Sequence, residues 1–205
     1  MLTKTEVVWR ELLVGFYVHE RRRQGRVTDL AERLGLPVST TYRALQRPAE
    51  MGALNITLRT GITLLSPPRL LVLWAAHRRP LADEIGRVRT NLSSRSAEDA
   101  LAQHAGTVLG GFGAVVAHLG GNTVAAYDTV LCYGPPDTLA HFTPADEGSG
   151  GQATVVLLQP DPLLSTYGRV TPLPQAYVDL FNQPSWQAAR FVEELDRRMV
   201  LPYAA

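Results

Sequence analysis

At 205 residues the chain is long enough for one or two domains, each with its own hydrophobic core. Its 45% apolar and 19% charged residues are typical of an ordinary globular protein and exclude a disordered or fibrous one. The net charge is only +1, but residues 1–90 hold 15 Lys and Arg against 8 Asp and Glu, whereas residues 91–205 hold 5 against 11. The basic first part favours a polyanionic partner, and the acidic remainder argues against a protein that coats nucleic acid non-specifically.

No run of residues reaches the roughly 18 consecutive apolar positions that a membrane span needs. The first residues, MLTKTEVVWRELL, carry scattered charges and lack the apolar core of a secretory signal. We therefore expect no membrane partner and a cytoplasmic protein, associated with the bacterial nucleoid. Cys132 is the single cysteine, which excludes an internal disulfide, and we expect it to act as a small buried hydrophobic residue.

The first 52 residues show the pattern of three helices. Apolar residues recur at helical spacing from Thr5 to about Arg23, and three arginines followed by Gly25 predict the end of that helix. A short second helix is expected to begin with Thr28 as its N-cap and to end at Gly35. The third helix corresponds to LPVSTTYRALQRPAEMG, residues 36–52.

Two short extended runs follow, ALNITL at 53–58 and GITLLS at 61–66, joined by a turn at Arg59-Thr60-Gly61. Alternation predicts one buried face on this hairpin, formed by Ile56, Leu58, Ile62 and Leu64. Three helices and a two-stranded wing within about 60 residues indicate a winged helix-turn-helix domain at residues 1–67.

The third helix is predicted to be the one that enters a DNA groove. If Thr41 and Leu45 face the core, the polar residues between them are exposed, where a recognition helix contacts bases and phosphates. Arginines suit guanine, glutamine suits adenine, and hydroxyl side chains suit phosphates. The expected DNA-binding residues are Ser39, Thr40, Tyr42, Arg43, Gln46 and Arg47 in this helix, with Arg26 before the second helix and Arg59 at the wing tip. The alternative is a three-helix protein-interaction domain whose arginines are merely solvated.

Pro48 interrupts this pattern, because a proline inside a helix removes a backbone hydrogen bond at a cost of roughly 3 kcal/mol. We expect it to end or kink the helix near Gln46. Base reading would then be confined to residues 38–47.

Pro67-Pro68 is expected to end the first domain, and residues 68–205 show the pattern of a mixed α/β domain. Helices are predicted at 69–79, with Leu70, Leu71 and Trp74 inward, and at 96–104. Strands are predicted at 123–133 and 153–159, with a loop at 141–151 before the second strand. The segment 174–200 is expected to form two helices, the second with Trp186, Ala189, Val192 and Leu195 inward.

No enzyme signature stands out in the second domain, and we predict no catalytic residues, no metal and no cofactor. The five histidines, at 19, 77, 104, 118 and 141, show no metal-ligand spacing. Gly110-Gly111 and Gly120-Gly121 lack the lysine and hydroxyl of a phosphate-binding loop, so turns and close helix packing explain them better. A nucleotidyltransferase needs paired aspartates after such a loop, and Asp128 stands alone.

The segment GRVTPLPQAYVDLFNQPSWQAARFVEEL, with Gln175, Tyr177, Asp179 and Leu180, resembles the Q-x-Y-x-D-L segment of the AbiEi family of type IV toxin-antitoxin systems. PPRLLVLWA and LGGFGAVVAHLGG lie in the same order before it, so the resemblance is loose but covers nearly the whole chain. Spacings of two residues place Gln175, Tyr177 and Asp179 on different sides of a helix, which favours a structural role.

What the resemblance implies is a repressor that binds operator DNA and regulates its own operon. Its second domain would counteract a nucleotidyltransferase-like toxin without forming a stable complex with it. Two other classes stay open: a regulator whose second domain senses a small molecule, and a low-specificity or repair-associated DNA binder. The oligomeric state is left open.

Overall fold

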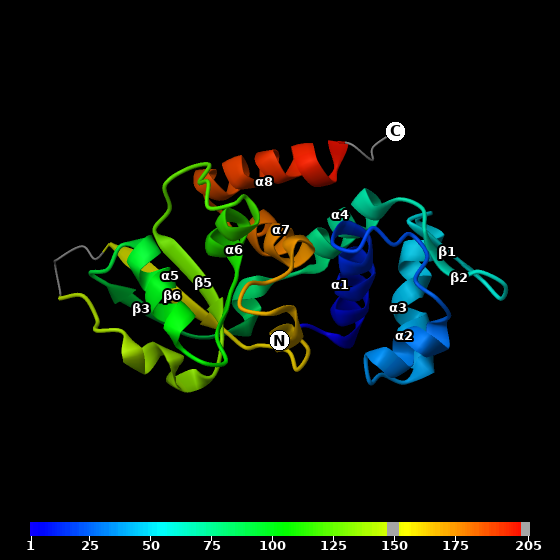
Figure 1. Ribbon diagram of the computed structural model, residues 1–205, viewed down its shortest axis with the longest axis horizontal. Helices are drawn as coiled ribbons and strands as arrows, with labels where there is room; N and C mark the ends of the chain where they lie inside the picture. The colour runs from blue at the N-terminus through cyan, green and yellow to red at the C-terminus, as the bar shows by residue number, and fades with distance from the viewer. Residues whose placement is uncertain (147–151, 202–205) are drawn as a thin grey trace. The chain divides into compact units, whose positions relative to one another are not determined.

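The computed structural model describes residues 1–146 and 152–201, so the end of the expected loop at 141–151 lies outside the described residues (Figure 1). Its contacts divide the chain into two compact units. Among the described residues, the winged-helix unit comprises residues 2–78 and 193–201, and the sheet unit comprises Met1 and residues 79–192. The architecture is the expected α+β combination of a winged helix-turn-helix and a mixed α/β region.

The division after Arg78 differs from the expected limit at 67. Pro67 and Pro68 do not end a unit but occupy the first turn of α4 (Pro67–His77), where a missing N–H is tolerated. This helix packs on α1 (Lys4–Tyr17) and α3 (Val38–Glu50), which assigns it to the winged-helix unit. Leu70, Leu71 and Trp74 are fully buried, as expected.

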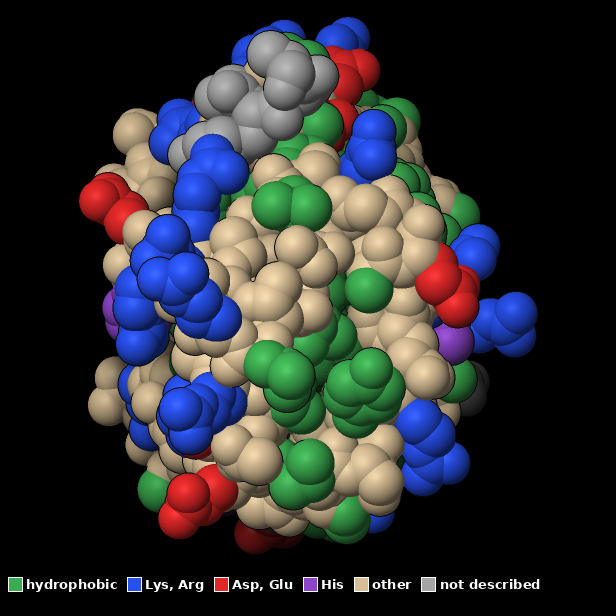
Figure 2. Space-filling view, turned by 90° about the vertical axis from the view of Figure 1, so that its right-hand side faces the viewer, with side chains coloured by type: hydrophobic (Ala, Val, Ile, Leu, Met, Phe, Trp, Pro, Cys, Tyr) green, Lys and Arg blue, Asp and Glu red, His purple; other side chains and the backbone are tan. Residues whose placement is uncertain are grey.

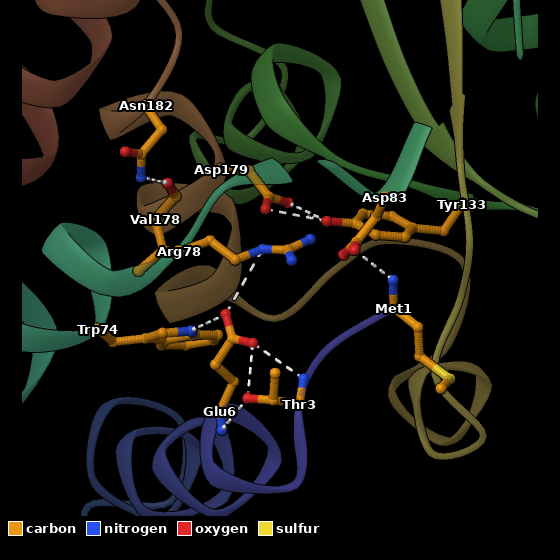
Figure 3. Close-up of polar contacts among 10 residues, drawn as sticks. All are labelled: Met1, Thr3, Glu6, Trp74, Arg78, Asp83, Tyr133, Val178, Asp179 and Asn182. Carbon is orange, nitrogen blue, oxygen red and sulfur yellow. Dashed lines mark hydrogen bonds and ion pairs between the residues drawn. The ribbon is translucent and has the colours of Figure 1, made fainter. Parts of the chain in front are cut away.

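Glu6 joins α1 to α4 through a set of buried polar contacts (Figure 3). Its carboxylate accepts hydrogen bonds from the Thr3 backbone at 2.9 Å and from the Trp74 indole at 3.4 Å. The Arg78 guanidinium lies 3.9 Å from the same carboxylate, and both side chains are almost completely buried. A buried charge is tolerated only when it is paired in this way, so these contacts fix the position of α4 on α1.

The first helix is shorter than predicted, because α1 ends at Tyr17 and not near Arg23. The chain turns back and pairs with the wing instead: the Gln24 N–H donates to Ile62 O, and the Ile62 N–H donates to Gly25 O. These bonds pair the backbone groups of residues 24 and 25 with the wing while the segment is extended. The same groups are then not available to continue the helix. The helix α2 (Val27–Arg33) then begins after Arg26, whose N–H donates to Asp29, so Thr28 is not the N-cap.

The wing consists of β1 (Leu54–Thr57) and β2 (Gly61–Leu64), paired antiparallel as predicted. Gly61 has φ +68°, and a Cβ there would lie 2.1 Å from the Gly25 carbonyl oxygen. Only glycine therefore allows the wing to approach the segment before α2 so closely. Ile62 and Leu64 are buried, but Leu58 is fully exposed because β1 has already ended at Thr57.

The helix α3 runs through Pro48, which contradicts the predicted end near Gln46. Pro48 cannot donate to the carbonyl of Ala44, four residues earlier. That carbonyl instead accepts a buried hydrogen bond of 2.7 Å from the indole N–H of Trp9 in α1. A tertiary contact thus replaces the missing helical bond, and the helix continues to Glu50.

The sheet unit is built on a four-stranded sheet in the order β3-β6-β5-β4. β6 runs parallel to β5, and the outer strands β3 and β4 are antiparallel to their neighbours. The strands are β3 (Glu84–Thr90), β4 (Val108–Leu109), β5 (Thr129–Tyr133) and β6 (Ala153–Leu158). The sequence predicted β5 and β6, with β5 shorter than the predicted run, and missed both β3 and β4.

The first face of the sheet is covered by α5 (Ser94–Gln103) and forms an apolar cluster. Cys132 is completely buried in this cluster, as expected, and burial raises the pKa of its thiol to about 12. The second face carries Leu131, Tyr133, Val156 and Leu158, with α6 (Gly111–His118) packed beside β5.

Gly110 and Gly111 allow α6 to approach β5. A Cβ on Gly110 would lie 3.0 Å from the Tyr133 ring, and one on Gly111 would lie 3.2 Å from Leu131 Cβ. Gly120 and Gly121 have positive φ in the turn after α6. The interpretation as close packing and turns is therefore supported over a phosphate loop.

The Q-x-Y-x-D segment lies in α7 (Leu173–Phe181), where Gln175, Tyr177 and Asp179 are all buried. The Tyr133 hydroxyl donates to the Asp179 carboxylate, at 2.8 and 2.9 Å from its two oxygens (Figure 3). This bond supports the predicted structural role of the segment. In α8 (Trp186–Met199) Leu195 is buried as predicted, but Trp186 is 65% exposed and Ala189 is also exposed, so the predicted inward positions of these two residues are wrong.

Glu98 of α5 is a buried carboxyl beside α6. The carboxyl accepts a hydrogen bond of 2.8 Å from the Tyr127 hydroxyl. It lies so close to α6 that a Cβ on Gly113 would be 2.6 Å from Glu98 Oε1. Burial raises the pKa of Glu98 above its ordinary 4.5, and the bond from Tyr127 offsets this only in part.

Replacing Glu98 with glutamine is expected to stabilise the protein at neutral pH. A carboxyl whose pKa is raised on folding contributes stability at low pH, and this stability is lost as the pH rises through the folded-state pKa. Glutamine keeps an acceptor for Tyr127 and carries no charge. The melting temperature of Glu98→Gln should exceed that of the wild type at neutral pH, with the difference shrinking toward about pH 4. Glu32→Gln, the same change at an exposed position of α2, is the control, and a pH-independent effect of Glu98→Gln would contradict the prediction.

Candidate nucleic-acid interface

One side of α3 is buried and the other is exposed, as the sequence predicted. Thr41, Ala44 and Leu45 lie in the core of the winged-helix unit. The expected DNA contacts lie between these positions: Thr40 is half-buried, and the exposed ones are Ser39, Tyr42, Arg43, Gln46 and Arg47. Because Pro48 does not end the helix, the exposed side extends through Glu50.

The two arginines of α3 differ in their surroundings. Arg47 lies 3.3 Å from Glu50, one turn later on the same exposed side, so its guanidinium is partly neutralised. Arg43 is exposed and has no hydrogen bond or ion pair within the part of the chain that the structure describes. Arg43 is therefore the side chain of the two that is more available for bidentate contact with a base.

The remaining expected contacts come from the wing and from the residue before α2. Arg59 is exposed in the turn of the wing, where the Thr57 hydroxyl accepts a bond of 2.9 Å from the Thr60 N–H. Arg26 is exposed, and its own N–H is used in the start of α2. Arg26 and Tyr42 of α3 line one hollow together with wing residues, so the structure brings the start of α2, α3 and the wing together.

This hollow has a volume of about 400 Å³ and a largely apolar lining that includes Val27, Ile56 and Leu58. Figure 2 shows the face that includes the wing, with apolar side chains gathered in its lower centre and Lys and Arg side chains on both sides of them. Tyr42 is 50% exposed there. Apolar contact of this kind suits sugar rings and thymine methyl groups, and the surrounding cations suit phosphates.

Two more basic residues lie beside the wing, although the sequence predicted them at the end of the first helix. Arg22 and Arg23 are exposed, and Arg23 pairs with Thr63 in the second strand of the wing. The excess of basic residues in the first part of the chain was the available signal. Their position beside the wing could not be predicted, because it depends on the pairing of residues 22–25 with β2.

Comparison with known families identifies the domain to which α3 belongs. Residues 17–55 match the IclR helix-turn-helix domain. The matched range runs from the end of α1 through α2 and α3 into β1, so it contains the predicted recognition helix. The protein therefore carries an IclR-type helix-turn-helix DNA-binding domain, which supports a DNA-binding transcriptional regulator. No match to a curated protein or to a solved structure was found.

The IclR-type match covers none of the sheet unit, and no comparison points to AbiEi proteins.

In residues 1–146 and 152–201, no group of three or more His, Cys, Asp or Glu residues has the arrangement of a metal site. His104 and His141, far apart in the sequence, stack with their ring centroids 3.6 Å apart. Among the described helices, none has both the length and the apolarity required to cross a membrane.

Proposed function

We propose that the protein is a sequence-specific repressor that binds operator DNA through α3 and the wing. The observation that carries the proposal is the exposed row of polar residues on α3 within the IclR-type match, with the uncommitted Arg43 at its centre. Gln46 and Arg43 would contact base edges. The residues that would contact phosphates are Ser39, Thr40, Tyr42, Arg26, Arg47 and Arg59. The protein would thus be associated with the nucleoid through its operator.

Binding of the full chain to a duplex from upstream of its own gene tests this proposal. Fluorescence anisotropy should give an affinity at least about 10³-fold higher than for a shuffled duplex at the same salt concentration. If Arg26, Arg47 and Arg59 each neutralise one phosphate, the slope of log K against log salt should be about −3 per protomer. Equal affinity for both duplexes would instead indicate a low-specificity DNA binder, and no binding to either would overturn the DNA role.

We further propose that the repressor is the antitoxin of a type IV pair, with the sheet unit counteracting a nucleotidyltransferase-like toxin. Support comes from the resemblance to AbiEi proteins in the segment of α7 and α8, whose Gln175, Tyr177 and Asp179 are buried. These residues would maintain the fold of the sheet unit and would not themselves contact the toxin. The protein would act on the toxin without catalysis of its own.

Co-expression with the product of the neighbouring gene tests the antitoxin role. If that gene encodes a nucleotidyltransferase, we expect the full chain to restore growth without co-purifying with the toxin. A variant defective in DNA binding, Arg43→Ala, should still restore growth, which separates the antitoxin role from repression. A neighbouring gene of another class, or growth arrest that persists in the presence of the full chain, would contradict this role.

A further inference from the structure

The second face of the sheet is hollowed where β5 and β6 begin. A cavity of about 310 Å³ lies there, and all of its lining residues belong to the sheet unit. Its lining includes Thr129 and Leu131 of β5 beside their register partners Thr154 and Val156 of β6. Since side chains alternate between the faces of a strand, these four point to the same side of the sheet. The floor therefore presents two neighbouring hydroxyl groups next to an apolar surface.

Aromatic rings form one wall of this cavity. Phe112 of α6 and Tyr127 both line it, and their rings stack with centroids 4.8 Å apart. Phe191 of α8 packs edge-on against both rings, at 5.1 and 5.9 Å, and Glu98 accepts a bond from the Tyr127 hydroxyl. These contacts hold the aromatic wall in place without a ligand, as expected for a site that is largely pre-formed.

Most of the remaining lining residues are polar, and together they carry little net charge. Arg87 of β3 donates to Glu84 through both Nε and Nη2, at 2.6 and 2.5 Å, so its charge is neutralised by this pair. Asp128 is the carboxylate in the lining, and Gln183 and Gln187 contribute carboxamides. An anionic ligand would meet Asp128 and a guanidinium that is already paired. The cavity is therefore better suited to a neutral ligand than to a phosphate or carboxylate.

These groups match a ring that carries neighbouring hydroxyl groups. A carboxylate or carboxamide presents two polar atoms in one plane and can bind two adjacent hydroxyls at once, whereas threonine hydroxyls both donate and accept. The apolar C–H face of such a ring packs well on an aromatic side chain. A volume of about 310 Å³ is at the lower end of the range for ligand sites, which corresponds to a small molecule.

We propose that this cavity of the sheet unit binds a neutral molecule with a vicinal-diol ring, either a free monosaccharide or the ribose of a nucleoside. The floor threonines and the two glutamines hold its hydroxyl groups, and Tyr127 packs against its ring. The proposal does not rest on DNA binding, because every residue that forms the site lies in the sheet unit.

Calorimetric titration of the full chain with D-glucose, D-galactose, D-ribose, adenosine and uridine tests the proposal. We expect saturable binding of at least one of them and a rise in melting temperature when that compound is in excess. Binding of sugars alone would identify a free monosaccharide, and binding of nucleosides alone would identify the ribose of a nucleoside. Absence of saturable binding by all five would overturn the proposal.

Two variants show whether such binding occurs in this cavity. Thr154→Val and Gln187→Leu preserve shape and remove hydrogen-bonding groups, so each should weaken binding about five- to tenfold. Gln103→Leu, on the exposed end of α5 and outside the cavity, is the matched control and should bind like the wild type. Unchanged affinity in both cavity variants would overturn the assignment. Tighter binding of glucose 6-phosphate than of glucose would overturn the preference for a neutral ligand.

Discussion

Replacing Arg43 with alanine is expected to weaken operator binding by about 1 to 3 kcal/mol, which is roughly 5- to 150-fold in affinity. Arg43 is exposed on α3, and no hydrogen bond or ion pair holds it within the described residues. Its five N–H groups are therefore available to a guanine edge. Competition anisotropy with the operator and its single-base variants should show that discrimination is lost at one base pair.

Two further variants separate base reading from a general loss of charge. Arg47→Ala should cost less than Arg43→Ala, because Glu50 already neutralises part of the charge of Arg47. Arg95→Ala removes the same charge from an exposed position of α5 in the sheet unit and should leave operator affinity nearly unchanged. If Arg43→Ala and Arg47→Ala both bind the operator like the wild type, the assignment of α3 as the recognition helix is wrong.

The exposed and buried sides of α3 were predictable because they depend only on a local period. Thr41 and Leu45 repeat at the spacing of a helix that is buried on one side, and the charged residues between them had to be exposed. Trp186 shows the limit of the same argument. The helix α8 does form where expected, but its buried side includes Ala188 and Leu195, rotated from the side that contains Trp186.

The strand β3 was missed because it lacks a local signature. Its sequence EIGRVRT places Ile85 and Val88 on opposite faces and includes Gly86, which is unfavourable in a strand. It is a strand because it pairs with β6, more than sixty residues later in the chain. The cavity of the sheet unit depends on this pairing, since β3 contributes Arg87, so the cavity could not be predicted either.

Leu58 and Arg23 show a similar dependence on partners. Alternation predicts Leu58 inward only if the strand continues, and β1 ends one residue earlier. Arg23 was assigned to a helix end by a local charge rule, yet the backbone around it pairs with β2. In both cases the local rule is sound, and a hydrogen bond to a distant segment decides the outcome.

Pro48 is the strongest case of a local rule overcome by tertiary structure, and it leads to a stability prediction. Trp9→Phe is expected to destabilise the protein by about 1 to 3 kcal/mol, because the buried Ala44 carbonyl loses its donor. For a chain of this size the melting temperature should fall by about 2 to 4 °C for each kcal/mol. Urea denaturation followed by far-UV circular dichroism of the full chain measures the loss.

The same substitution should cost less in a chain that already carries Pro48→Ala. Alanine at 48 restores a backbone N–H that can donate to the Ala44 carbonyl, so that carbonyl no longer depends on Trp9. The double-mutant cycle should therefore give a coupling free energy of about 1 kcal/mol between residues 9 and 48. Phenylalanine is smaller than tryptophan, but the loss of packing is common to both backgrounds and cancels in the cycle. A cost that is equal in the two backgrounds would mean that α3 continues through Pro48 for a reason other than the Trp9 hydrogen bond.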